Sequence, residues 1–145
     1  MDLKHTVLYA DDDLDDIMLV KDIFQNHSRN VDLVTVKNGA EAISFLNSLS
    51  PDDPSPCLVI LDINMPVMDG KETLIELRNM RRFKEVPVIM FTTSSLPNDK
   101  DFASKYNADF LTKPINYKQM DLIADVFIDN CAEEVKKKIR KEPKK

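Results

Sequence analysis

The sequence has 145 residues, of which 43% are hydrophobic and 31% are charged, a balance that allows a buried core and excludes a disordered polymer. The length predicts a single domain. No apolar run approaches the ~18 residues of a membrane span, and the N-terminus MDLKHTVLYADDD has acidic residues where a signal peptide has its apolar stretch. We therefore expect a cytoplasmic protein without a membrane partner.

Charge is distributed unevenly along the chain. The net charge is −5, but residues 136–145 (KKKIRKEPKK) carry a net charge of +6, which leaves −11 for residues 1–135. An acidic body repels nucleic acid, so direct nucleic-acid binding is not expected. We interpret residues 134–145 as a basic tail or helix extension, which either is solvated or binds something acidic.

Segments with strand and helix patterns alternate along the chain. Five apolar runs have strand length, at residues 5–10, 31–36, 57–62, 87–92 and 108–112. Residues at helical spacing lie between and after them: Ile17, Val20, Ile23 and Phe24; Ala42, Phe45, Leu46 and Leu49; Leu74, Leu77 and Arg78, a helix whose apolar side is narrower; and Met120, Ile123, Ala124, Phe127 and Cys131. A weaker helix is predicted over 96–106, beginning near Pro97.

The sequence also indicates two helix starts and one loop. Asn38 followed by Glu41 resembles a capping box, and Asn116 is a candidate cap for the last helix. The Pro- and Ser-rich segment 48–56 predicts an exposed loop. Strictly alternating strands and helices imply a mostly parallel sheet with helices on both faces, because parallel neighbours need crossover connections.

The residues that end the predicted strands carry the chemistry. In an open parallel sheet, functional groups gather beyond the carboxyl ends of the strands. The first strand ends at Asp11-Asp12-Asp13, the third at Asp62, the fourth at Thr92-Thr93-Ser94 and the fifth at Lys113-Pro114. Singly, each has a plain structural explanation as a helix start, a turn or a strand-end hydroxyl. Their joint placement predicts one site.

The composition of this predicted site favours phosphoryl transfer. Clustered carboxylates repel one another unless a cation joins them, and Mg²⁺ prefers one or two carboxylates together with a phosphate oxygen. A lysine and a hydroxyl can bind phosphate oxygens, and an aspartate can act as the nucleophile that forms an aspartyl phosphate. These residue types fit an in-line transfer in which positioning and charge neutralisation supply the catalysis.

The cysteines and histidines point to no further chemistry. Cys57 and Cys131 each lie among apolar residues, as buried thiols in a reducing compartment do, so a disulfide framework is not expected. Neither has a CxxC partner, which argues against zinc binding. His5 and His27 stand alone.

The strings LYADD, LVILDINMPVMDG, VIMFTTSS and ADFLTKP resemble the receiver domain of two-component response regulators, over about residues 4 to 130. The resemblance implies a flavodoxin-like α/β fold with a five-stranded parallel sheet of order 2-1-3-4-5. It places the receiver domain at residues 1–133, with no output domain after it. The stand-alone, chemotaxis-regulator-like members are the most similar, in particular those paired with phytochrome-type or hybrid kinases.

The resemblance also implies roles for individual residues. Asp62 is the phosphoacceptor, and Mg²⁺ is held by Asp12 and Asp62 directly, by Asp11 through water and by the Asn64 backbone carbonyl. Thr92 is the switch hydroxyl and Lys113 contacts the phosphate, with the Lys113–Pro114 bond expected to be cis. Phe110 stands at the switch aromatic position, where relatives often have Tyr, so switching by Phe110 would act through packing alone. Asn64 and Ser94 match positions that influence hydrolysis of the aspartyl phosphate.

The implied function is that of a phosphoprotein in signal transduction and not of a metabolic enzyme. A sensor histidine kinase or hybrid kinase donates the phosphoryl group to Asp62, and the new dianion draws in Thr92 and Lys113 and repacks Phe110, which changes the binding of a downstream protein. A monomer and a homodimer through the last helices are both compatible. Passing phosphate onward to a phosphotransfer protein, acting as a phosphate sink and serving as a degenerate scaffold receiver are the alternatives.

Two rival sites lack a required residue. A phosphohydrolase of the haloacid-dehalogenase type needs a second Asp two positions after the nucleophile, where this sequence has Asn64. A calcium loop beginning at Asp11 needs Gly at its sixth position and Glu at its twelfth, where the sequence has Asp16 and Asp22.

Overall fold

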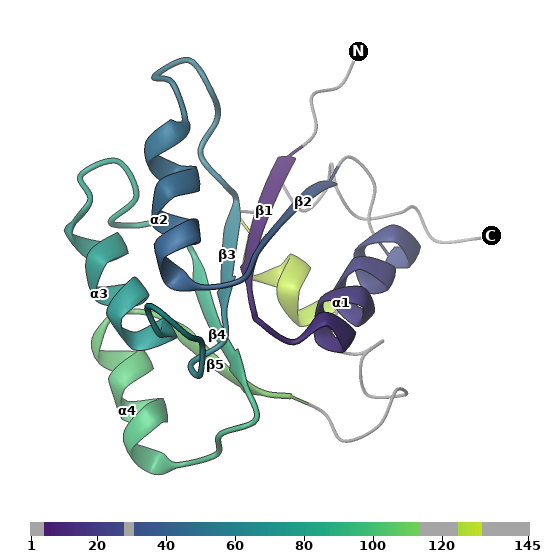
Figure 1. The fold of residues 1–145 in the computed structure, drawn as a ribbon, viewed down its shortest axis with the longest axis vertical. Coiled ribbons are helices and arrows are strands. Elements are labelled where there is room, and N and C mark those ends of the chain that lie inside the picture. The colour runs from purple at the N-terminus through teal and green to yellow at the C-terminus, as the bar shows by residue number, and fades with distance from the viewer. Residues whose placement is uncertain (1–4, 28–30, 114–124, 132–145) are drawn as a thin grey trace.

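The computed structural model describes residues 5–27, 31–113 and 125–131. Strands and helices alternate within them (Figure 1). They are β1 (His5–Ala10), α1 (Leu14–His27), β2 (Val31–Val36), α2 (Gly39–Ser48), β3 (Leu58–Leu61), α3 (Gly70–Asn79), β4 (Val88–Thr92), α4 (Pro97–Lys105) and β5 (Asp109–Thr112). Residues 125–129 are also helical. The predicted alternation is confirmed, and every strand lies within one residue of its predicted bounds.

The strands form one parallel sheet of order β2-β1-β3-β4-β5, which confirms the predicted fold class. Every residue of β3 and β4 is buried. Strands covered on both faces need apolar side chains at successive positions, and the continuous runs LVIL and VIMF supply them. These central strands give the sheet a rigid middle, from whose carboxyl ends the candidate site projects.

Helices cover the two faces of the sheet unequally. In Figure 1, α2, α3 and α4 lie on one side, and α1 lies on the other with the yellow-green segment 125–131. That second face is rich in aromatic rings: Phe127 packs edge-to-face on Phe91 at 5.3 Å and stacks with Phe24 at 6.0 Å. Such ring pairs add to the stabilisation that area burial provides, so Phe127 holds the C-terminal segment on the sheet.

The starts of α2 and α3 are fixed by side-chain caps. Asn38 accepts a hydrogen bond from the Glu41 backbone, as predicted. The Glu41 carboxylate, however, accepts from the Lys37 backbone N–H and not from that of Asn38, so this cap is not the reciprocal box that the sequence suggested. A reciprocal capping box does form at α3, between Asp69 and Glu72, where the sequence reading did not expect one.

The first residue of α3 lies directly against the chain that leaves β3. A Cβ atom at Gly70 would stand 2.1 Å from the backbone oxygen of Asp62, so only glycine fits there. The Gly70 N–H donates to the Ile63 backbone oxygen at 2.8 Å. Helix α3 therefore buttresses the backbone that carries Asp62.

Arg78 joins α3 to two connecting segments at the amino ends of the strands, one before β4 and one before β5. Its guanidinium group donates to the backbone oxygens of Tyr106, Lys84, Val86 and Asn107 at 2.8 to 3.1 Å. Burial lowers the pKa of Arg78. The sequence groups Arg78 with Leu74 and Leu77 at helical spacing, and the structure shows that its guanidinium group links α3 to the chain after α4 and to the chain before β4.

Several predictions concern residues outside the described ranges: the cap at Asn116, the stripe residues Met120, Ile123 and Ala124, the Lys113–Pro114 bond and the basic segment 134–145. From the same predicted stripe, Phe127 and Cys131 are described and are buried as expected. Among the described helices, none combines the length and the apolar character that a bilayer span requires.

Candidate functional site

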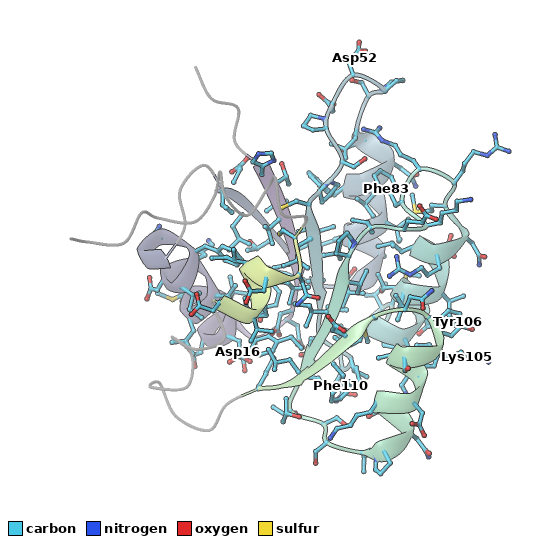
Figure 2. The ribbon with its side chains drawn as sticks, turned by 180° about the vertical axis from the view of Figure 1, so that it is seen from behind. Asp16, Asp52, Phe83, Lys105, Tyr106 and Phe110 are labelled. Carbon is cyan, nitrogen blue, oxygen red and sulfur yellow. The ribbon has the colours of Figure 1, made fainter. Side chains whose placement is uncertain are left out.

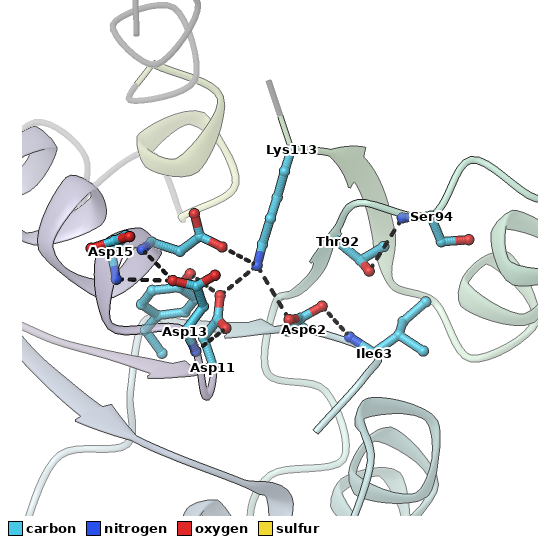
Figure 3. A network of polar contacts seen from close by, with 10 residues as sticks. Asp11, Asp13, Asp15, Asp62, Ile63, Thr92, Ser94 and Lys113 are labelled. Atoms are coloured by element: carbon cyan, nitrogen blue, oxygen red, sulfur yellow. Dashed lines mark hydrogen bonds and ion pairs between the residues drawn. The ribbon is translucent and has the colours of Figure 1, made fainter. Parts of the chain in front are cut away.

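Four of the predicted site residues meet at the carboxyl edge of the sheet (Figure 3). Asp11 follows β1, Asp62 follows β3, Thr92 ends β4 and Lys113 follows β5. The strand ladder continues into them: Asp62 N–H donates to Ala10 O at 3.0 Å, and Lys113 N–H donates to Thr92 O at 2.7 Å. Parallel pairing thus sets their relative positions, as the sequence analysis predicted.

Asp11, Asp12 and Asp62 form the acidic cluster of this site. Each offers a carboxylate oxygen within 4.8 Å of the others. Asp11 and Asp62 are 0% and 7% exposed, whereas Asp12 is exposed. Burial and mutual repulsion disfavour this much negative charge without a cation. A set of carboxylate oxygens that is open to solvent on the Asp12 side matches the ligands that Mg²⁺ takes in proteins, so the residues fit the predicted metal.

Lys113 already supplies a positive charge to these carboxylates. Its Nζ lies 2.6 Å from Asp11 Oδ2, 2.7 Å from Asp16 Oδ2 and 3.2 Å from Asp62 Oδ2, and Figure 3 shows it reaching between the ends of β1 and β3. Burial acts to lower the pKa of Lys113, but the hydrogen bonds to Asp11 and Asp16 outweigh it and hold that pKa above its usual value. Lys113 is therefore a firmly charged ammonium group.

Burial works against the ionised form of the Asp62 carboxyl group. Burial raises its pKa above the usual range; the charge of Lys113 opposes this rise, the charge of Asp11 adds to it, and a hydrogen bond from Thr92 opposes it. Asp62 Oδ1 also accepts from the Ile63 backbone N–H at 2.7 Å. The carboxylate is thus oriented by Thr92 and Ile63 on one side and by Lys113 on the other.

Two residues that the sequence analysis did not select also belong to the site. The hydroxyl of Tyr9, which is fully buried, donates to Asp11 Oδ2 at 2.5 Å. Burial raises the pKa of Tyr9, and so does the charge of Asp11, so the phenol stays a donor. The signal in the sequence was the spacing, since residues two apart in a strand share a face. Asp16, in the first turn of α1 (Figure 2), pairs with Lys113 over a separation of 97 residues, which no local pattern reveals.

A second polar network leads from Thr92 to helices α3 and α4. The Ser94 N–H donates to Thr92 Oγ1 at 3.4 Å, and the Ser94 hydroxyl donates to Asp99 Oδ2 at 2.5 Å. Lys71, in α3, pairs with Asp99 Oδ1 at 2.5 Å. Hydrogen bonds from Lys71 and Ser94 lower the pKa of Asp99. The loop after β4 is therefore tied to both helices.

The remaining predicted residues lie around this centre. Asn64 is exposed two positions after Asp62. Phe110 is half-buried on β5 beside α4 (Figure 2) and packs on the core that lies under α2, α3 and α4. Phe102 and Tyr106 of the α4 region pack on the same core. Phe110 thus shares its packing partners with the α4 region. A movement of the β4–α4 loop that shifts α4 would therefore also affect the packing of Phe110.

Comparisons with known proteins agree with the resemblance found in the sequence. The family described as "Response regulator receiver domain" matches residues 7–125. Response regulator Rcp1 from Synechocystis sp. is 30% identical over 119 residues, which cover 79% of this chain and 80% of that protein. The chain belongs to the response regulator receiver domain family. Membership makes it a receiver domain of two-component signalling and implies a histidine kinase as partner.

Solved structures extend the likeness to the fold. The phosphorylated cyanobacterial phytochrome response regulator RcpA superposes with a TM-score of 0.80 at 25% identity, over 90% of this chain and 96% of that one. The Mn²⁺-bound form of Rcp1 gives 0.75 at 27% identity, over 84% and 90%. The chemotaxis protein CheY4 of Vibrio cholerae gives 0.70 at 26% identity, over 86% and 98%. The predicted resemblance to receiver domains, including the phytochrome-associated group, is confirmed.

Some relatives are much longer. A protein-glutamate methylesterase/protein-glutamine glutaminase from Geobacillus kaustophilus is 35% identical over 119 residues, but the match spans only 32% of its length. The shared part is the receiver domain, and the cluster of Asp11, Asp12 and Asp62 has the composition typical of the metal site of that domain.

Proposed function

We propose that this receiver domain accepts a phosphoryl group on Asp62 from a histidine kinase, with Mg²⁺ bound by Asp11, Asp12, Asp62 and the Asn64 backbone carbonyl. The observation that carries the proposal is the position of Asp62: a buried carboxylate at the end of a central strand, beside two further carboxylates and 3.2 Å from the Lys113 ammonium group. The proposed chain unit is the receiver domain at 1–133, followed by the basic segment 134–145.

In the transfer, an Asp62 carboxylate oxygen forms a bond to phosphorus while the bond from phosphorus to the donor imidazole nitrogen breaks. The released imidazole takes up a proton. Thr92 donates a hydrogen bond to an oxygen of the transferred group, and Lys113 neutralises part of its charge. Mg²⁺ held by Asp11, Asp12 and Asp62 would supply further charge neutralisation for the transfer. Tyr9 holds Asp11 in place throughout.

The same contacts couple the modification to the surface. In this structure the Lys113 ammonium group forms ion pairs with Asp11, Asp16 and Asp62 at the same time. A dianion on Asp62 would compete for Lys113 and Thr92, and a shift of Thr92 would be felt by Ser94 and Asp99 through their hydrogen bonds. The packing that surrounds Phe110 would then rearrange. A downstream protein that binds this face would distinguish the two forms.

The phosphoacceptor role is tested with a small phosphodonor. The full chain is incubated with acetyl phosphate and Mg²⁺, and intact mass is recorded for the wild type, Asp62→Ala and Asp32→Ala, whose aspartate is exposed on β2. We expect one added phosphoryl group on the wild type and on Asp32→Ala, and none on Asp62→Ala. An unlabelled wild type, or equal labelling of Asp62→Ala, would contradict the proposal.

The switch role of Phe110 needs a different readout. Phe110→Ala should be labelled by acetyl phosphate almost as well as the wild type, because the apolar ring of Phe110 packs on the core. Its phosphorylation-dependent binding to the downstream protein should weaken. Unchanged binding would show that the switch does not use Phe110.

The relay role is tested separately. Transfer of the phosphoryl group onward, detected as added mass on a phosphotransfer protein, would support it.

A further inference from the structure

The two cysteines of the chain lie side by side although 74 positions separate them. The Sγ atoms of Cys57 and Cys131 are 3.5 Å apart, and no disulfide joins them. Cys57 immediately precedes β3, and Cys131 closes the helical segment that begins at residue 125. The sequence predicts no disulfide framework, and nothing in it indicates this proximity, because each cysteine simply occupies an apolar run.

Each cysteine lies at the end of a strand or helical segment and is fixed there by a backbone hydrogen bond. The Cys57 N–H donates to Thr6 O at 2.9 Å, which extends the β1–β3 pairing by one residue. The Cys131 N–H donates to Ile128 O at 3.0 Å, in the turn that ends the segment. Both side chains pack on the core that contains Phe127 and Ile128. The encounter of the thiols is therefore built into the fold.

The two thiols differ in exposure. Cys57 is half-buried and Cys131 is 5% exposed. The Cys131 thiol donates a hydrogen bond to Cys57 Sγ, which lowers the pKa of Cys57 although burial acts in the opposite direction. An oxidant from solvent meets Cys57 first, and the hydrogen bond from Cys131 favours the reactive thiolate form of Cys57. Cys131 is placed to attack it from within.

We propose that Cys57 and Cys131 form a reversible intramolecular disulfide when the protein meets a hydroperoxide, and that this bond fastens the C-terminal segment 125–131 to the start of β3. The Cys57 thiolate attacks a peroxide oxygen, the O–O bond breaks and Cys57 becomes a sulfenic acid, with hydroxide or alkoxide leaving. The Cys131 sulfur then attacks the Cys57 sulfur, the S–O bond breaks and water leaves with the thiol proton. The two electrons lost by the cysteines are those gained by the peroxide.

This modification site is separate from the acidic cluster, so it does not depend on phosphorylation of Asp62. It nevertheless bears on the same fold element. Phe127, one helical turn before Cys131, packs on Phe91, which directly precedes Thr92. A covalent bond at Cys131 limits how far this segment can move from the sheet.

The test uses the full chain, freshly reduced and treated with hydrogen peroxide. Intact mass, counting of thiols after unfolding and peptide mapping follow the product. We expect the loss of two hydrogens in a monomeric product, a Cys57–Cys131 cross-linked peptide and full reversal by a thiol reductant. Cross-linking should be at least about tenfold slower when the same oxidation is run in urea, because unfolding separates the two thiols. Retention of both thiols, a disulfide between chains or an equal rate in urea would overturn the proposal.

Single substitutions identify the order of events. With Cys131→Ser, peroxide should leave a sulfenic acid on Cys57 that a dimedone probe traps; with Cys57→Ser, the remaining thiol should react much more slowly. Asp62→Ala should oxidise like the wild type, which separates this proposal from that of the phosphoacceptor. Equal trapping in both cysteine variants would contradict the assigned order.

Amide hydrogen exchange tests the fastening itself. In the oxidised protein, exchange of the backbone amides in residues 125–131 should slow by about tenfold or more, because the disulfide suppresses local opening of this segment. Exchange in β2, on the far edge of the sheet, should be unchanged. Equal exchange of the segment in the reduced and oxidised proteins would mean that the bond fastens nothing.

Discussion

The phenol of Tyr9 donates a 2.5 Å hydrogen bond to Asp11 Oδ2, the same oxygen that Lys113 Nζ approaches to 2.6 Å. Asp11 Oδ1 accepts from the Asp13 backbone N–H at 2.9 Å. One carboxylate of the acidic cluster is therefore held by a buried aromatic residue, a cation and the main chain together. Its orientation is set before any ligand arrives.

Replacing Tyr9 by Phe should weaken metal binding while preserving the fold. The ring stays in the core, but Asp11 loses the donor that orients it, and loss of such an outer partner typically costs about tenfold or more in metal affinity. Titration of Mg²⁺ or Mn²⁺ by calorimetry measures the effect. Tyr106→Phe, on the α4 side, is the control and should bind like the wild type. Equal affinity in Tyr9→Phe would show that the phenol is not needed to orient Asp11.

Replacing Lys113 by Met should destabilise the metal-free protein. The side chain is 7% exposed and compensates three carboxylates, and removing one partner of a buried ion pair typically costs about 3 kcal/mol or more. Because the pKa of Lys113 is raised, this contribution is present below the usual value of 10.5 and is lost as pH rises through the folded pKa.

Urea unfolding with and without Mg²⁺ checks this prediction. The cation should stabilise Lys113→Met more than the wild type, since it replaces the missing charge. Lys100→Met, at an exposed position of α4, is the matched control and should change stability little. A metal-free Lys113→Met protein as stable as the wild type would contradict the role of Lys113 as the resident counter-charge.

The raised pKa of Asp62 predicts a pH-dependent cost. Between the ordinary value of 3.8 and the folded pKa, the folded protein binds more protons than the unfolded chain, so stability falls as pH rises through this window. In metal-free buffer, Asp62→Asn should therefore be more stable than the wild type at neutral pH, with the difference vanishing as pH falls below 3.8. Urea unfolding across this range measures it, and Asp32→Asn should show no such convergence.

Arg78 is expected to matter for stability through geometry more than through charge. Its guanidinium group satisfies four backbone oxygens, a pattern that the single ammonium group of lysine cannot reproduce. Arg78→Lys should lower the free energy of unfolding by about 2 kcal/mol. The exposed Arg81→Lys, only three residues further on, should lower it far less. Equal effects of the two substitutions would show that the clamp contributes nothing.

Local patterns were sufficient to predict the elements of this fold. The run LVIL predicts β3 because it needs apolar cover on both faces, and the helical spacing of Ile17, Val20 and Phe24 predicts α1; all of these residues are buried. The rule that parallel strands end at one edge was enough to bring Asp11, Asp62 and Lys113 together. These conclusions depend only on periodicity and on topology.

What could not be predicted depends on side chains that meet across long stretches of sequence. The Lys113–Asp16 pair spans 97 residues and the Cys57–Cys131 contact spans 74. The spacing of Arg78 with Leu74 and Leu77 predicts a helix but not its hydrogen bonds, because its backbone partners, Tyr106 and Asn107, lie on a connection whose path the sequence does not specify. The partner of a polar side chain is set only when the whole chain folds. A hydrophobic stripe, in contrast, is visible in the sequence of a single segment.

The wide separation between Lys113 and its carboxylates also affects how the domain comes into being. Asp11 leaves the ribosome 102 residues before Lys113, and Asp62 leaves it 51 residues before. Until β5 is made and pairs with β4, Asp11, Asp16 and Asp62 lack the Lys113 ammonium group that pairs with them in the folded domain. Domains generally fold as units during synthesis, and here Lys113, directly after β5, delivers the neutralising charge. A fragment that stops short of Lys113 is therefore expected to keep an open, self-repelling edge, so that completion of the sheet and completion of the site are one event.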